Sequence, residues 1–127
     1  MTVPEWLEEG EVLAIHESLL SLHGGAEGMR DEGLLQSALA RPRQLFSYGG
    51  PPPDICALAA AYAAGIINNH PFVDGNKRTG FILAYAFLRL NGLELRAGEA
   101  ETYEIIMALA SGNLPESGFA QWLRKWT

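Results

Sequence analysis

The sequence has little cysteine, no long apolar run and few basic residues. Its 127 residues include one cysteine, Cys56, so no disulfide can form within the chain and a reducing, cytoplasmic setting is expected. The longest apolar runs, residues 55–67 and 81–88, are shorter than the roughly 20 residues that a membrane span requires. The first residues have neither the basic nor the apolar region of an export signal. We therefore expect a cytoplasmic localisation and no membrane partner.

The charge balance argues against nucleic acid as a direct partner. Nine Lys and Arg residues stand against fifteen Asp and Glu residues, which gives a net charge of -6. Sequence-independent binding to a nucleic-acid backbone requires a basic face on the protein. The composition, 48% hydrophobic and 19% charged, is typical of a globular protein, and no internal repeat or low-complexity tract divides it. We expect a single domain over residues 1–127.

The first part of the chain predicts two amphipathic helices. Apolar residues recur at steps of three and four over residues 9–23, which is the period of a helix with one buried face. Asp31 is a suitable N-cap for a second helix over residues 33–40. We expect that helix to end before Pro42, because a residue that precedes proline disfavours helical backbone angles.

Two helices in the middle of the chain are predicted to form its centre. Asp54 can cap a helix over residues 55–67, which is rich in alanine and apolar on all sides, and residues 81–88 are also apolar on all sides. Such helices are surrounded by other helices, so the two should be neighbours. The polar segment between them, residues 68–80, must then lie at one end of the core.

The C-terminal part predicts two further helices. Residues 93–98 are compatible with an extended stretch before a helix on which four residues share a face: Tyr103, Ile106, Met107 and Ala110. A last short helix opens near Pro115 and carries an aromatic stripe that we interpret as core, with part of a partner groove as the alternative: Phe119, Trp122, Leu123 and Trp126. The predicted class is all-α, a compact bundle of about six helices that leaves room for a short hairpin or flap.

The segment His70–Thr79 contains the residues that we predict to form a functional site. Pro71 makes helical angles costly for His70, so the preceding helix should end there with its imidazole at the terminus. Gly75 permits a tight turn into the next helix, whose first turn then holds Lys77 and Arg78. A helix N-terminus has unpaired N–H groups and a partial positive charge, so cations in that turn are unfavourable unless an anion binds there.

These residue types together predict a phosphate site with a base and a metal ligand. The cradle would comprise Gly75, Asn76, Lys77, Arg78 and Thr79. A carboxylate beside phosphates, here Asp74, is a usual ligand for Mg²⁺. His70 has a ring that can take a proton from an attacking hydroxyl. Each residue also has a simpler interpretation alone, since Asp74 could be an N-cap, His70 a C-cap, and Lys77 and Arg78 solvated charges.

Residues 70–78 resemble the active-site motif of the Fic/Doc superfamily, H-P-F-x-[DE]-G-N-[GK]-R, at every position. Residues 23–42 and 76–92 also look like death-on-curing proteins, the Doc branch. The resemblance implies a small helical domain that moves a phosphate-containing group from a nucleotide to a protein hydroxyl. It also implies that His70 is the general base, that Asp74 holds Mg²⁺ and that residues 75–78 cradle the phosphates.

Two positions separate the possible reactions. Adenylyltransferases of the Fic group have glycine after the asparagine and a second arginine three residues past the first, where this sequence has Lys77 and Phe81. Similarity to the Doc branch implies transfer of the γ-phosphate of ATP to a threonine of translation elongation factor Tu, which would inhibit translation. His70, Lys77 and Arg78 would then be catalytic. The alternatives are a nucleotidyltransferase and a non-enzymatic module that binds a nucleotide or a protein.

The resemblance also suggests how the protein is regulated and what other segments do. The self-inhibitory motif of some Fic proteins, [ST]-x-x-x-E-[GN], does not occur, so a cognate antitoxin in a second chain is implied. The loop over residues 41–54 corresponds to a target-positioning flap, with a proline-rich connector as the alternative. His16 and His23 lie on the apolar side of the first predicted helix and are interpreted as packing residues.

Overall fold

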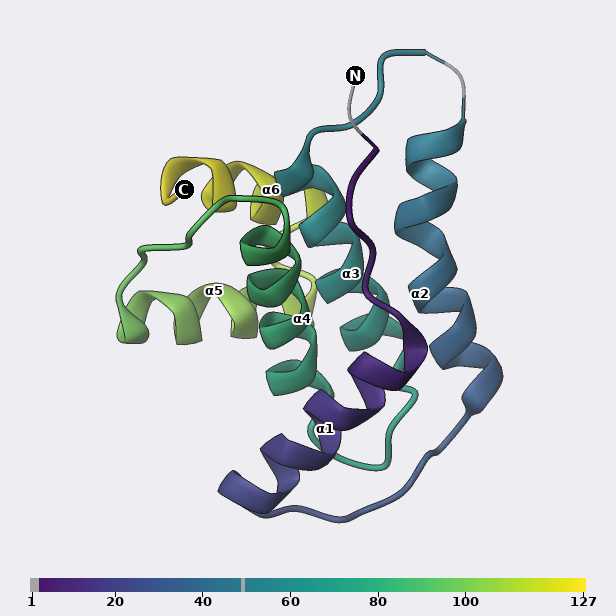
Figure 1. Cartoon of the computed structure of the whole chain (residues 1–127). Coiled ribbons are helices and arrows are strands. Elements are labelled where there is room, and N and C mark those ends of the chain that lie inside the picture. Colours follow the sequence, from purple (N-terminus) through teal and green to yellow (C-terminus); the bar gives the residue numbers. More distant parts are fainter. Residues whose placement is uncertain (1–2, 49) are drawn as a thin grey trace.

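The computed structural model describes residues 3–48 and 50–127, which form six helices (Figure 1). The helices in chain order are α1 (Glu9–His23), α2 (Glu32–Ser47), α3 (Ile55–Asn69), α4 (Asn76–Leu90), α5 (Glu99–Ser111) and α6 (Glu116–Lys125). Over the described residues there is no strand, and the only β-type pairing is an isolated bridge between Met29 and Phe72. The all-α class and the six helices are confirmed, whereas a hairpin does not occur in the part of the chain described.

Helix α3 lies at the centre of the bundle, with α4 beside it (Figure 1). Nearly all of α3 is buried, as its alanine-rich sequence predicts, and the Asp54 side chain caps it by accepting a 2.8 Å hydrogen bond from the Ala57 N–H. Gly80 of α4 allows the two backbones to approach, because a Cβ there would lie 3.0 Å from the Ala63 carbonyl oxygen. The predicted pairing of the two central helices is confirmed. The predicted burial of residues 81–88 on all sides is wrong, because Phe81, Ile82, Tyr85 and Ala86 of α4 are only partly buried.

Helix α2 is longer than predicted, because it continues through Pro42 to Ser47. Proline inside a helix removes one hydrogen bond and costs about 3 kcal/mol. Pro42 is buried with Leu35, Ala38 and Leu39 on the side of α2 that packs on α3, and this burial offsets that cost. The predicted end before Pro42 is therefore wrong, while the predicted N-cap is right, since the Asp31 side chain accepts from the Leu34 N–H at 3.0 Å.

The segment predicted as a flap does not reach the α3–α4 loop. Residues 41–47 belong to α2, and residues 48 and 50–54 lie between α2 and α3, whereas Gly49 lies outside the described residues. Helix α3 has 15 residues, so its two ends are about 22 Å apart. Figure 1 shows the α2–α3 connection and the α3–α4 loop at opposite ends of the bundle. The prediction of a flap over residues 41–54 is wrong, and the connection between α1 and α2 lies beside the α3–α4 loop instead.

The outer helices agree with the sequence in most respects. Helix α1 has the predicted bounds; His16 is buried as a packing residue, but His23 is exposed, so that half of the prediction is wrong. The aromatic stripe of α6 is core, since Phe119 and Trp122 are buried. None of the described helices is long and apolar enough to span a membrane.

Candidate active site

The α3–α4 loop begins at a residue with an unusual backbone conformation. His70 has φ 51° and ψ 54°, the left-handed region, and it is the only described residue other than glycine with a positive φ. Its N–H still donates to the Ile66 carbonyl at 3.0 Å, so it closes the last turn of α3. The predicted end of this helix at His70 is confirmed, and the side chain is exposed.

Asn76 holds the middle of the loop. Its Oδ1 accepts from the Phe72 N–H at 3.1 Å, and its Nδ2 donates to the Phe72 carbonyl at 3.0 Å. Both residues are buried, so the amide satisfies the two backbone groups of Phe72 where water cannot. Both polar atoms of the Asn76 side chain are thus already hydrogen-bonded within the protein. Its backbone N–H is the group that can still donate to a ligand.

The N-terminus of α4 is cationic and has no side-chain cap. Gly75, with φ 80°, precedes the helix, and Asn76, Lys77 and Arg78 form its first turn as predicted. The N–H groups of a first turn lack partners within the helix. Lys77 and Arg78 are exposed, and neither forms a salt bridge with any described carboxylate. Unpaired donors, the helix dipole and two positive charges together favour an anion at this position.

Asp74 lies at the edge of this cationic turn. Its Oδ2 accepts from the Ala26 N–H at 3.2 Å, and its Oδ1 accepts from the Gly75 N–H at 2.8 Å. These bonds, with a smaller contribution from the charge of Arg78, hold the pKa of the carboxyl below its usual range. The N-cap position of α4 belongs to Gly75, so the simpler interpretation of Asp74 as that cap is not what the structure gives.

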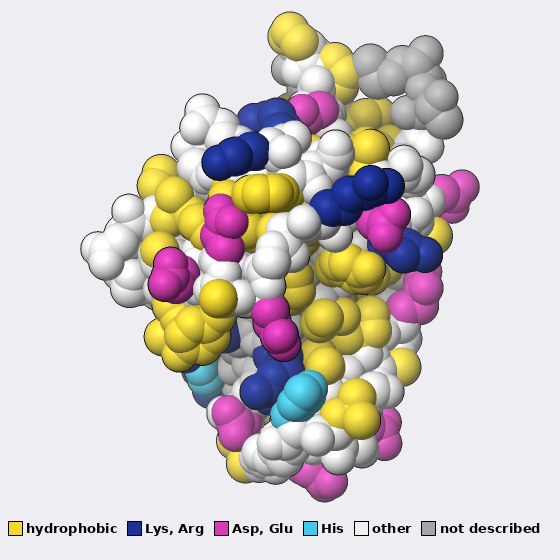
Figure 2. Space-filling view, turned by 90° about the vertical axis from the view of Figure 1, so that its left-hand side faces the viewer, with side chains coloured by type: hydrophobic (Ala, Val, Ile, Leu, Met, Phe, Trp, Pro, Cys, Tyr) yellow, Lys and Arg dark blue, Asp and Glu magenta, His cyan; other side chains and the backbone are white. Residues whose placement is uncertain are grey.

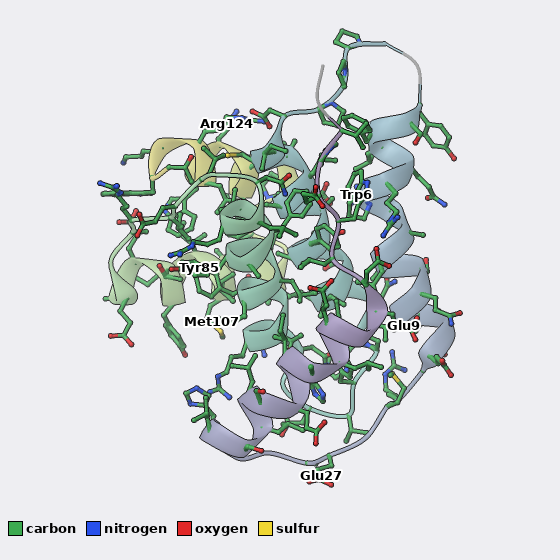
Figure 3. All side chains as sticks on the ribbon, in the orientation of Figure 1. Trp6, Glu9, Glu27, Tyr85, Met107 and Arg124 are labelled. Carbon is green, nitrogen blue, oxygen red and sulfur yellow. The ribbon has the colours of Figure 1, made fainter. Side chains whose placement is uncertain are left out.

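Most of the predicted site residues line one cleft of about 730 Å³. This volume is within the usual range of small-molecule sites, about 300–1,000 Å³. Its polar side includes six residues predicted for the site: His70, Asp74, Gly75, Asn76, Lys77 and Arg78. The facing wall comes from α5 and includes Tyr103, Ile106, Met107 and Ala110, the four residues predicted to share a face. Figure 3 shows Met107 on the side of α5 near the first turns of α4.

Thr79 is placed differently from its prediction. It is fully buried and does not line the cleft, and its hydroxyl has no hydrogen-bond partner. Successive residues of a helix are rotated by about 100°, so Thr79 shares the buried side of α4 with Asn76, three residues before it, whereas Lys77 and Arg78 are exposed. Its side chain is therefore not available to a ligand in the cleft.

Two residues outside the predicted set support the loop. His16 of α1 stacks on Phe72 with ring centroids 3.7 Å apart, and Arg30 donates to the carbonyl oxygens of Asn69 and His70. The sequence predicts no role for Arg30 and only a packing role for His16. Their partners lie 39 to 58 residues away in the chain, and such contacts leave no periodic signal in a single sequence.

On the face drawn in Figure 2, positive charge does not form one broad surface. On the face drawn in Figure 2, basic side chains form small separate groups, with acidic and apolar side chains between them. The chain as a whole carries a net charge of -6. An anion would therefore be attracted by the first turn of α4 and not by a broad basic surface.

The fold and the cleft define a small all-α domain in which a cationic helix terminus, a histidine and a carboxylate meet. The model of the Fic/DOC family matches residues 6–88. Protein kinase doc of Escherichia phage P1 is 30% identical over 115 residues, 91% of this chain and 90% of that protein. Toxin Doc of Mycolicibacterium smegmatis is 38% identical over 93 residues, 73% of this chain and 69% of that protein. This chain belongs to the Fic/Doc family, within its Doc branch of toxins.

Proposed function

We propose that this protein is an ATP-dependent protein phosphotransferase, which moves the γ-phosphate of ATP to a hydroxyl of a protein target. The main support for the proposal is that His70, Asp74 and the first turn of α4 line the same cleft. The relative named Protein kinase doc supports the same reaction class. The acceptor that we propose is a threonine of translation elongation factor Tu, so that the modification inhibits translation.

The phosphates of ATP would be held by the first turn of α4. Backbone N–H groups there, together with Lys77 and Arg78, offer charge-assisted hydrogen bonds to phosphate oxygens. Negative charge on the transferred group and on the leaving group must be stabilised during phosphoryl transfer. Lys77 and Arg78 need no rearrangement of salt bridges to do so, since no described carboxylate pairs with them.

His70 would act as the general base. The acceptor hydroxyl oxygen forms a bond to the γ-phosphorus while the bond from that phosphorus to the bridging oxygen of ADP breaks. The hydroxyl proton passes to the His70 imidazole, and ADP leaves with the electron pair of the broken bond. The exposed position of His70 on the cleft permits an acceptor from another protein to reach it.

Asp74 fits the requirements of a magnesium ligand. Two backbone N–H groups use part of its hydrogen-bonding capacity, and the carboxylate keeps acceptor positions toward the cleft that it lines. No group of three or more metal-ligating side chains occurs among the described residues. Mg²⁺ is commonly held by one or two carboxylates together with substrate phosphates, and when bound it neutralises phosphate charge.

Phe81 favours γ-phosphate transfer over nucleotide transfer. It lines the cleft one turn beyond Arg78 and offers no hydrogen-bond donor. Transfer of a nucleotidyl group requires the β- and γ-phosphates to be held as the leaving group, so donors are needed beyond the attacked phosphorus. An apolar residue there suits a ligand whose terminal phosphate alone lies in the cradle.

We also propose that a cognate antitoxin, a separate chain, restrains this toxin in the cytoplasm. Expression of the chain alone should arrest growth and protein synthesis, and co-expression of a small adjacent reading frame should relieve the arrest. Growth without arrest at a verified level of folded protein would contradict the toxin function.

The reaction is tested with ATP labelled separately at the α- and γ-phosphates, incubated with purified elongation factor Tu and the full-length protein. Label transferred only from the γ position supports the phosphotransferase. Label transferred from the α position would establish nucleotidyl transfer instead. Absence of transfer to the elongation factor and to every protein of a lysate, with ATP binding retained, would establish a binding module.

A further inference from the structure

The connection between α1 and α2 is hydrogen-bonded to the α3–α4 loop. The Val73 N–H donates to the Gly28 carbonyl at 3.0 Å, and the N–H groups of Arg30 and Asp31 both donate to the Pro71 carbonyl, at 2.7 and 3.0 Å. Figure 3 shows Glu27, which lies in this connection, at the lower end of the bundle where the loop also lies. The loop that carries His70 is thus attached to a second segment far away in the chain.

Arg30 makes the most specific of these contacts. Its Nε donates to the His70 carbonyl at 2.6 Å, and its Nη2 donates to the Asn69 carbonyl at 2.7 Å. The last carbonyl oxygens of a helix have no partner within the helix, and the helix dipole makes that end negative. The planar guanidinium therefore satisfies two adjacent terminal carbonyls of α3 and places a positive charge at the favourable end of the helix.

These two bonds bear on the conformation of His70. Its left-handed backbone, φ 51°, is sparsely populated by residues other than glycine and persists only where neighbouring structure holds it. Rotation of that backbone toward the ordinary helical or extended regions would turn the His70 carbonyl away from the Arg30 Nε. The same rotation would redirect the imidazole relative to the cleft.

We propose that Arg30 is a positioning residue that fixes the backbone of His70, and with it the direction of the imidazole. The proposal rests on the proposed function for the role of His70 as base, while the effect on its backbone does not. Lysine cannot replace Arg30, because a single ammonium group lacks the planar fork that spans two carbonyls.

The kinetic test compares R30A and R30K with R89A in transfer of the γ-phosphate. Arg89 is an exposed arginine in the last turn of α4, and its guanidinium forms no hydrogen bond or salt bridge with the described residues, so it serves as the matched control. We expect kcat to fall about tenfold to a hundredfold in both Arg30 variants, with KM for ATP within about twofold, because base orientation is lost and the phosphate cradle is kept. Methylguanidinium should restore part of the activity of R30A, whereas R89A should resemble the wild type.

A second measurement does not depend on activity. The three-bond coupling between the His70 amide and α protons reports φ, and we expect it to change in R30A and R30K while the same coupling of residues in the centre of α3 stays constant. Wild-type kcat in both Arg30 variants would overturn the positioning role. A loss of kcat that follows a lower melting temperature and is not rescued by methylguanidinium would also overturn it, since the role would then be only structural.

The two proposals fail in distinguishable ways. Absence of transfer by the wild-type protein would contradict the proposed function, and the coupling would then decide on Arg30 alone. A His70 coupling that is the same in the wild type and in R30A would overturn the positioning role whatever the activity.

Discussion

The Nε2 atom of His16 lies 2.9 Å from the carbonyl oxygen of Asp74. A carbonyl oxygen can only accept, so Nε2 carries the hydrogen and donates it. The imidazole also stacks on Phe72, and it is buried. Helix α1 is thereby bound to both the apolar anchor of the α3–α4 loop and the residue that precedes the turn into α4, so the position of the cleft depends on α1.

Replacement of His16 separates the stacking from the hydrogen bond. In H16F an aromatic ring can still stack on Phe72, and only the donor to Asp74 is lost, so we expect a loss of about 1 kcal/mol in the free energy of unfolding. H16A also removes the buried ring and should cost about 3 kcal/mol. Urea unfolding followed by circular dichroism measures both, and equal losses in the two variants would contradict a separate contribution from the stack.

Replacement of His70 tests the base. H70A should lower transfer of the γ-phosphate by at least about a hundredfold, since general bases contribute roughly 10²–10⁴ in rate. Its melting temperature should stay near that of the wild type, because the side chain is exposed. H23A, at the exposed histidine of α1, is the control and should keep full activity. An H70A variant as active as wild type would remove the assignment of the base.

The cationic turn predicts the pattern of ATP affinity. K77A and R78A should each weaken ATP binding by about tenfold or more, because each removes a charge-assisted hydrogen bond of roughly 1.5–3 kcal/mol. The loss should shrink as salt is raised, since the site is open to solvent. K125A, at the end of α6, should bind like the wild type. Calorimetric titration with ATP measures these affinities, and unchanged binding in K77A and R78A would rule out the anion site.

The burial of Thr79 away from the cleft can be tested by substitution. T79V removes a buried hydroxyl that has no partner and keeps the shape of the side chain. We expect unchanged ATP affinity and a free energy of unfolding that is equal to the wild type or higher by about 1 kcal/mol, because an unsatisfied polar group is lost. Weaker ATP binding in T79V, with an unchanged free energy of unfolding, would show that the Thr79 hydroxyl takes part in phosphate binding.

Asp54 gives the protein a defined acid sensitivity. The carboxylate caps α3 and accepts two hydrogen bonds from Arg124, at 2.6 and 3.0 Å, and Arg124 is the main cause that holds the pKa of Asp54 below its ordinary value. A depressed pKa contributes stability above the unfolded value of about 3.9, and this is lost as pH falls through the folded value. D54A should lose about 1 kcal/mol or more at pH 7, because the cap is removed.

The comparison of D54N with the wild type isolates the charge of Asp54. The amide can still cap the helix, so any difference in the free energy of unfolding reflects the ion pair, which is worth up to about 1 kcal/mol at a surface. We expect the difference at pH 7 and its progressive loss as pH falls below the ordinary carboxyl pKa of about 3.9 and through the lower folded value. A difference that grows as pH falls would contradict the sign of the pKa shift.

The sequence alone determined the class, the centre and the composition of the candidate site. The apolar character of residues 55–67 and 81–88 favours burial, so two neighbouring helices with a polar loop at one end followed from composition, although one side of residues 81–88 is only partly buried. Pro71 after His70 and glycine at position 75 define where the helices end and begin, because these are local steric effects. Such effects depend only on residues that are close together in the sequence, so they can be predicted without knowledge of the tertiary structure.

Only the tertiary structure decided which side chains share the cleft and which segments support it. Burial against α3 allowed α2 to pass through Pro42, because packing outweighed a local preference. The direction of the fourth residue of α4 placed Thr79 in the core, and the length of α3 separated residues 48 and 50–54 from the loop. The hydrogen bonds of His16 and Arg30 join residues at least 39 positions apart, so they exist only once the chain has folded.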